Sequence, residues 1–153
     1  QRLLKNVGHD VRRLSHELIP PRFDNTSLTE LVEIYCQSMT AEGGTIVKSF
    51  ISKSFLKLSI SGSKALEIYR IIQECVSNAI KYGYSKMITV ELDANDHLAI
   101  ACITNDLSPE HSVSKDKEGI GKNTLRIRTD TLKAKLNIVK NKEEYKVEVH
   151  IPL

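Results

Sequence analysis

Apolar residues recur at three- and four-residue steps through residues 65–83, and this period predicts a helix with one buried face. The opposite side of the same helix carries polar residues. We expect Ser61 or Ser63 to cap the helix and Gly83 to end it. The apolar row comprises Ala65, Ile68, Ile72, Cys75, Val76, Ala79 and Ile80, and the polar row comprises Glu67, Arg70, Glu74, Asn78 and Lys81.

Two more helices are predicted before this central one. Residues 1–18 have helical periodicity that Pro20 and Pro21 stop, because proline lacks the amide donor and restricts the residue before it. Residues 28–42 predict a helix that Asn25 or Ser27 caps and that Gly43 and Gly44 end. Residues 45–51 predict a strand, and residues 55–62 predict a short strand or an extended approach to the central helix.

Alternating patterns after the central helix predict strands at 86–93, 97–104, 135–140 and 144–151. Asn95 and Asp96 form the turn of an antiparallel hairpin between the first two strands. The last strand alternates Val147, Val149 and Ile151 with polar residues, so one of its faces is expected to be packed and the other wet. Between the strand pairs, residues 107–118 predict a loop, and a helix carrying Leu125, Ile127 and Leu132 follows.

Composition narrows the class of protein. A chain of 153 residues is long enough for one domain with a proper core, and no apolar run reaches the roughly 18–20 residues that cross a bilayer. The net charge of +3 is spread over interleaved lysines and acids with few aromatics, which gives little support to nucleic-acid binding. Cys36, Cys75 and Cys102 lie within apolar patterns and are expected to be buried, reduced thiols.

The polar row of the central helix holds candidate chemistry. Glu74, Asn78 and Lys81 lie on successive turns of one face. Carboxylate and amide oxygens can bind a hard cation such as Mg²⁺, and an ammonium group can bind phosphate. The alternative is a solvated helix face, which is the more common meaning of this spacing.

The motif around this row resembles a known family. QECVSNAIKYG (73–83) is similar to the N-box of sensor histidine kinases in the GHKL ATPase superfamily, and EIYRIIQE (67–74) resembles the lead-in found in the subfamily that pairs with LuxR/NarL-type response regulators. The resemblance implies that Asn78 holds Mg²⁺ and that Glu74 orients a metal-bound water or accepts the histidine proton. It also implies that Lys81 and Tyr82 belong to the ATP site.

Two further boxes of the family have counterparts here. ITNDLS (103–108) matches the D-box, in which Asn105 takes the place of the adenine-binding aspartate, Asp106 is the alternative adenine partner, and Leu107 replaces a glycine. GIGKNTLRIRTDTLKAKLNI (119–138) resembles the G-box, in which Gly119 and Gly121 let the backbone approach phosphates. The loop at 107–118 corresponds to the ATP lid. The Gly-Thr pair that usually supports the D-box is missing.

Side chains near the G-box leave alternatives open. Lys122, where the family usually has leucine, is either an extra phosphate contact or a solvent-facing substitution, and the second is favoured. Arg126 and Arg128 can reach phosphate or a partner helix, but surface salt bridges are the favoured interpretation.

RRLSHELIPPRF (12–23) resembles the end of the second dimerisation helix of the same subfamily. We therefore expect residues 1–22 to be the end of a stem and residues 23–153 to be the ATP-binding domain. His9 and His16 are expected to be surface or interface residues. The resemblance places His9 on the second helix of the stem, whereas the phosphoacceptor belongs on the first, so the phosphoacceptor histidine is expected upstream. The chain opens on Gln1 without a signal peptide, and we expect it to be a piece of a longer protein.

The expected fold is an α/β two-layer sandwich of the Bergerat type, a mixed sheet with helices on one face. The resemblance implies the catalytic domain of a sensor histidine kinase, cytoplasmic and part of a membrane-anchored homodimeric sensor. ATP and Mg²⁺ would be its cofactors, a LuxR/NarL-type response regulator its partner, and nucleic acid no direct partner. The alternatives are another GHKL ATPase or serine kinase, and a degenerate domain that binds nucleotide weakly and acts as a dimerisation module.

Overall fold

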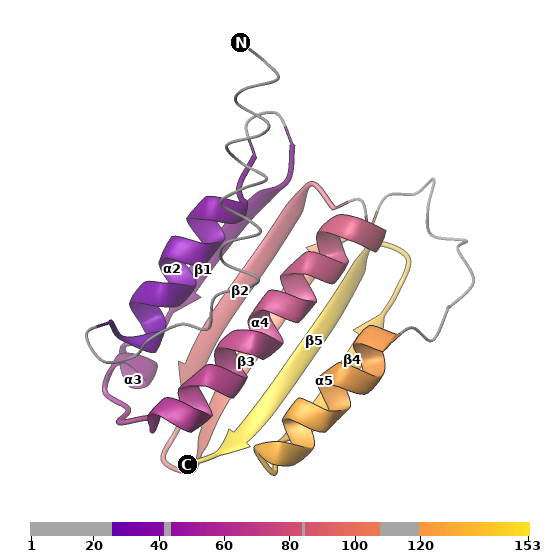
Figure 1. Cartoon of the computed structure of the whole chain (residues 1–153). Coiled ribbons are helices and arrows are strands. Elements are labelled where there is room, and N and C mark those ends of the chain that lie inside the picture. Colours follow the sequence, from indigo (N-terminus) through magenta and orange to yellow (C-terminus); the bar gives the residue numbers. More distant parts are fainter. Residues whose placement is uncertain (1–25, 42–43, 84, 108–119) are drawn as a thin grey trace.

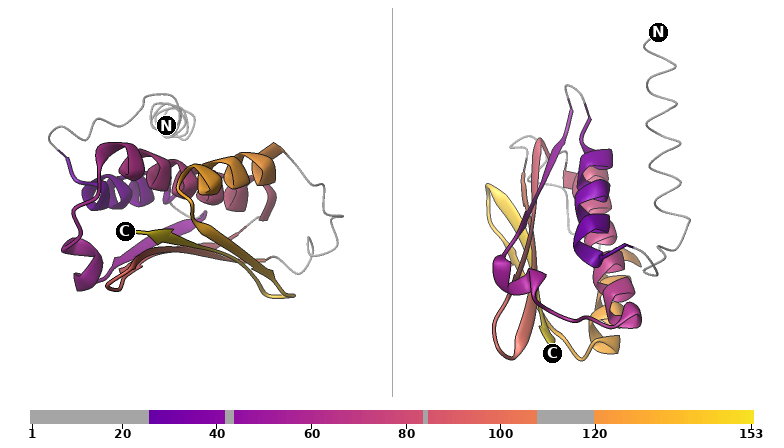
Figure 2. Two further views of the ribbon diagram at one scale, coloured as in Figure 1. Left: turned by 90° about the horizontal axis from the view of Figure 1, so that it is seen from below. Right: turned by 90° about the vertical axis from the view of Figure 1, so that its left-hand side faces the viewer.

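A computed structural model describes residues 26–41, 44–83, 85–107 and 120–153 of the chain. Five strands form one mixed sheet in the order β1-β2-β3-β5-β4. The helices α2, α4 and α5 cover one face of this sheet, as Figure 2 shows. The predicted two-layer α/β sandwich is therefore confirmed. Within the described part of the chain, no helix combines the length and the apolar character needed to cross a membrane.

The strands confirm the predicted positions. They are β1 (Ile46–Ile51), β2 (Met87–Ala94), β3 (Leu98–Asp106), β4 (Lys135–Lys140) and β5 (Glu144–Pro152). β1 pairs with β2 in parallel, and the other three pairings are antiparallel, including the predicted β2–β3 hairpin. The register sets Ile88 opposite Asn105, so the end of β3 lies beside the beginning of β2.

Three helices form the covering layer: α2 (Leu28–Met39), α4 (Gly62–Gly83) and α5 (Ile120–Thr131). Ser27 caps α2 through a capping box with Glu30. Ser61 caps α4, because its Oγ accepts the backbone N–H of Lys64 at 3.4 Å. The alternative caps are accounted for, since Ser63 lies inside α4 and Asn25 lies outside the described residues.

The core lies between the sheet and the helices. Six of the seven apolar residues predicted for the buried face of α4 are buried, and Ile80 packs against the core while partly exposed. They meet the inward residues of the central strands, among them Ile88, Val90, Ile103 and Val149. All three cysteines are buried and unpaired, as predicted.

Two predicted elements were wrong in part. Residues Lys53–Leu56 form a one-turn helix, α3, where a short strand was one of the two possibilities. The helix α2 ends at Met39 and not at residue 42. Thr40 ends it, because its Oγ1 accepts the backbone N–H of Val47 at 3.0 Å and so ties the chain to β1.

The sheet face away from the helices carries polar side chains. On β5, Glu148 contacts Lys146 at 3.0 Å and His150 at 2.6 Å. The hydrogen bonds from His150 and Lys146 lower the pKa of Glu148. Val147 and Val149 point the opposite way into the core, so the predicted alternation of a packed and a wet face is confirmed.

Candidate functional site

The elements that carry the sequence motifs adjoin one another. Figure 1 shows the last turn of α4 at the upper right end of the molecule and the first turn of α5 lower down on the right, beside α4. The helix α4 packs against both β3 and α5. This arrangement follows from the sheet order, because β3 occupies the centre and α4 lies across it. The N-box and D-box segments therefore meet at this end.

The polar row of α4 presents a bonded amide and carboxylate. Asn78 Nδ2 donates to Glu74 Oε1 at 3.1 Å, across one helical turn, and both side chains are partly exposed. This bond leaves Asn78 Oδ1 and Glu74 Oε2 with no hydrogen-bonding partner among the described residues. Lys81 and Tyr82 follow on the last turn and are exposed, Tyr82 to 72%.

The donor set of this row can be tested for a metal. No three His, Cys, Asp or Glu side chains of the described ranges cluster as a metal site would require. A dedicated all-protein cage is therefore not formed there. One carboxylate and one amide oxygen do fit Mg²⁺, which usually retains several waters and takes its remaining ligands from substrate phosphates.

The lower part of the row joins two helices. Arg128 of α5 donates to Glu67 of α4, with Nη1 and Oε2 2.9 Å apart, and both side chains are about a quarter exposed. The salt bridge favoured for Arg128 is thus confirmed, and it holds α5 against α4. Arg126 is exposed on the same helix.

Asn105 sits in a buried hydrogen-bond network at the end of β3. Its side chain is only 5% exposed, and its Nδ2 donates to Ser85 Oγ at 2.9 Å and to the Asp106 carbonyl at 3.0 Å. Ser85 Oγ donates in turn to that same carbonyl at 2.8 Å. Both amide hydrogens of Asn105 are used in this way, so its Oδ1 is left as an acceptor, and no described residue donates to it.

Asp106, the alternative adenine partner, is engaged differently. Its Oδ1 accepts the backbone N–H groups of Lys86 and Met87, each at 2.9 Å. The carboxylate therefore satisfies the first amides of β2 and ties that strand to the end of β3. The Asp106 side chain is thus held by the backbone of β2 through Oδ1, whereas Asn105 Oδ1 accepts from no described residue.

Gly83 and Ser85 are contributors to this end of the molecule that the sequence did not reveal as site residues. A Cβ at Gly83 would lie 2.8 Å from Ser85 Oγ and 3.1 Å from Asn105 Nδ2, so only glycine lets the end of α4 approach the network. Ser85 is 3% exposed. The available signal was the pair of small residues, two positions apart, between a helix end and a strand.

The glycine motif lies at the beginning of α5. The helix begins at Ile120, so Gly121 and Lys122 are in its first turn, as predicted. Gly119 and the lid segment at 108–118 lie outside the described residues, and so do His9, His16 and the stem segment. Of the described cavities, one of about 560 Å³ is lined by Ser85 and Ile80 but not by the polar row of α4.

Comparisons with known proteins identify the fold. The fold is that of histidine kinase catalytic domains. The chain resembles the histidine kinase domain of the blue-light activated histidine kinase of Erythrobacter litoralis EL346, with 14% identity, 95% of this chain and 74% of that one covered, and a TM-score of 0.66. It also resembles the histidine kinase AdeS of Acinetobacter baumannii, with 15% identity, 99% and 79% covered, and a TM-score of 0.62.

The sequence comparison points to the same group. The oxygen sensor histidine kinase NreB of Staphylococcus carnosus is 26% identical over 103 residues, which are 67% of this chain and 29% of NreB. The chain therefore spans under a third of the length of this curated relative. No protein-family profile matches it. In sequence the chain is similar to a sensor histidine kinase, and its fold is that of histidine kinase domains.

Proposed function

We propose that the chain is the ATP-binding catalytic domain of a two-component sensor histidine kinase. It would transfer the γ-phosphoryl group of ATP to a histidine on a stem helix, for relay to an aspartate of a LuxR/NarL-type response regulator. The full protein would act in the cytoplasm as a homodimer held by its stem helices and anchored to a membrane. The relationship to sensor histidine kinases supports the class, and the Glu74–Asn78 pair is the observation that carries the chemistry.

In this proposal, the two oxygens left by the Glu74–Asn78 hydrogen bond face the phosphates. Asn78 Oδ1 holds Mg²⁺, and Glu74 orients a water on it or accepts the proton of the histidine. Mg²⁺, when bound, neutralises charge between the phosphates, which is the main source of catalysis in phosphoryl transfer. Lys81, one turn further along, contacts phosphate, and Tyr82 borders the nucleotide.

Asn105 is the residue proposed to bind adenine. Its two amide hydrogens are held by Ser85 Oγ and the Asp106 carbonyl, so Oδ1 is oriented to accept the adenine N–H. Asp106 takes the supporting role of fixing β2. Gly119 and Gly121 let the backbone at the beginning of α5 approach the phosphates, and Lys122 adds a positive charge nearby.

Binding of a fluorescent ATP analogue, with and without Mg²⁺, tests the proposal. We expect Mg²⁺-dependent binding that Asn78→Ala abolishes. Asn137→Ala is the matched control, because Asn137 is also partly exposed but lies on β4. Unchanged binding by Asn78→Ala would refute the metal role, provided that both variants unfold at the same urea concentration as the parent.

Phosphotransfer then separates the candidate enzymes. A radiolabelled ATP assay with a histidine-bearing stem polypeptide supplied in trans should give an acid-labile phosphohistidine. An acid-stable phosphoserine product would favour a serine kinase of the same superfamily.

A degenerate interaction domain is the second candidate, and Asn105 favours it. A neutral amide acceptor lacks the charge assistance that makes a hydrogen bond roughly twice as strong, so nucleotide affinity would be low. Absence of nucleotide binding at millimolar concentration, together with a folded protein, would select this candidate.

A further inference from the structure

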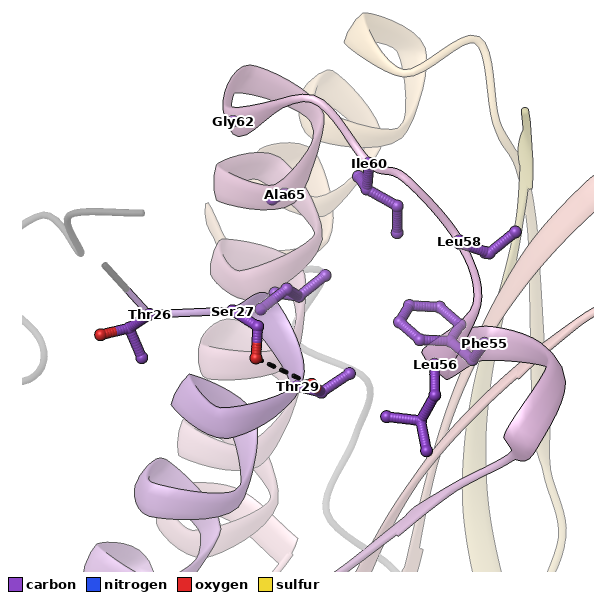
Figure 3. Close-up of a pocket in the computed structure, with 10 residues that line it drawn as sticks. Thr26, Ser27, Thr29, Phe55, Leu56, Leu58, Ile60, Gly62 and Ala65 are labelled. Atoms are coloured by element: carbon purple, nitrogen blue, oxygen red, sulfur yellow. Dashed lines mark hydrogen bonds between the residues drawn. The ribbon is translucent and has the colours of Figure 1, made fainter. Parts of the chain in front are cut away.

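A groove with one apolar wall and one polar wall lies at the end of the helical layer where α2 and α4 begin. Its volume is about 240 Å³. Figure 3 shows Phe55, Leu56, Leu58 and Ile60 along one side and the first residues of α2 on the other, with Ala65 of α4 behind them. The rim on the α2 side is polar, where Ser27 Oγ and Thr29 Oγ1 lie 3.0 Å apart.

The groove is large enough for an aromatic ring. An enclosed apolar cavity of about 150 Å³ binds benzene, and the groove, with about 240 Å³, is of a size that a phenyl group can enter. Leu56 on its wall is 59% exposed. A ring placed there would remove further leucine surface from water, which is favourable by about 25 cal/mol per Å².

The chain itself supplies a ring at the right place. Phe23 is the only aromatic residue among residues 1–25, and it precedes Thr26, which lines the groove, by three positions. Three residues span at most about 10 Å even when fully extended. The backbone of Phe23 is therefore tethered within that distance of Thr26.

We propose that the side chain of Phe23 occupies this groove and docks the connection 20–25 onto the domain. The docked ring fixes where the preceding segment leaves the domain, so that a displacement of that segment is transmitted to the beginnings of α2 and α4. The proposal concerns the chain's own packing and is independent of nucleotide binding.

A single indole reports on the groove. The chain contains no tryptophan, so Phe23→Trp introduces the only one, in the full chain. We expect blue-shifted emission and several-fold weaker quenching by acrylamide than free N-acetyltryptophanamide shows. Adding Leu56→Glu on the groove wall should return both values towards those of the free indole, because a charge there opposes an apolar occupant.

Val139→Glu in the same Phe23→Trp background is the matched control. Val139 is 53% exposed, close to the 59% of Leu56, but lies on the edge strand β4 at the other side of the sheet. This variant should leave the indole shielded. The proposal is overturned if the indole of Phe23→Trp alone is exposed to solvent. It is also overturned if Leu56→Glu leaves the indole shielded, or if Leu56→Glu and Val139→Glu expose it equally. Shielding that disappears on dilution assigns the ring to a second copy and also overturns it.

A thermal measurement gives a second readout without tryptophan. Phe23→Ala should lower the Tm and Phe23→Leu should lower it less, because leucine fills part of the same groove. In the Leu56→Glu background the two substitutions should have little further effect. Equal losses with and without Leu56→Glu would show that Phe23 packs elsewhere.

Discussion

Replacing Ser85 by alanine removes one hydroxyl from the buried network at the end of β3, and we expect a loss of both stability and nucleotide affinity. The hydroxyl makes two hydrogen bonds, from Asn105 Nδ2 at 2.9 Å and to the Asp106 carbonyl at 2.8 Å. A buried hydrogen bond contributes about 0.5–1.5 kcal/mol net, so the pair is worth about 2 kcal/mol. Asn105 retains its bond to the Asp106 carbonyl, which keeps the cost below that of a fully unpaired amide.

Urea denaturation should show this loss as a lower midpoint with an unchanged slope. In a domain of this size, 2 kcal/mol lowers the Tm by about 4–8 °C. Nucleotide affinity should fall by about tenfold, equivalent to about 1.4 kcal/mol, because the amide of Asn105 is no longer held in one orientation. Ser59→Ala, at an exposed position, is the control for losing a serine hydroxyl.

Two outcomes would count against this reasoning. A change in unfolding free energy below about 0.5 kcal/mol would mean that the two bonds contribute nothing measurable. Normal affinity in a clearly destabilised variant would mean that the network supports the sheet but does not orient Asn105 toward a ligand.

Lys133, just after α5, has a φ of 52°, a left-handed conformation that costs a non-glycine residue about 1–2 kcal/mol. Lys133→Gly should therefore raise the free energy of unfolding in urea by up to about 1 kcal/mol. A lower free energy of unfolding would refute the strain at this residue. Glu67→Gln and Arg128→Gln should each lower the free energy of unfolding, because each removes the ion pair that holds α5 against α4. A double-mutant cycle should give a coupling energy of about 0.5–1 kcal/mol. Additive effects would show that the ion pair does not contribute to stability. Burial raises the pKa of the Cys36 and Cys75 thiols from 9.0 to about 12. The folded protein keeps these thiols neutral, so their contribution to stability is complete below pH 9. It should fall by up to about 1.4 kcal/mol per thiol per pH unit between pH 9 and 12. Urea denaturation of the parent and of Cys75→Ala at pH 8 and pH 10 will measure this fall.

The elements with a clear period could be predicted from the sequence. The apolar row of α4 repeats within a helix of 22 residues, which is roughly six turns. The β2–β3 hairpin has alternating strands on both sides of Asn95 and Asp96. The helix α3 has no such signal, because one turn is too short to show a period. It forms because Ser52 Oγ accepts the N–H of Phe55 at 3.1 Å and Phe55 is buried.

The candidate site was predictable to the extent that it lies within one element. Glu74 and Asn78 are one turn apart on α4, so spacing alone placed them together. The network around Asn105 joins residues twenty positions apart, and Ser85 enters it only because the β2–β3 register brings the two strand ends together. The end of α2 escaped prediction for the same reason, since Thr40 bonds to Val47 on β1.

The helices cover only one side of the sheet, and this has a practical use for anyone who wishes to attach a dye or tether to the domain. Val139 lies on the bare side, in register with Lys146 and far along the sheet from α4. The native thiols are buried and neutral at ordinary pH, so maleimide chemistry on Val139→Cys should modify that one position. Single-molecule recordings could then test for the proposed nucleotide binding while the opposite surface stays unmodified.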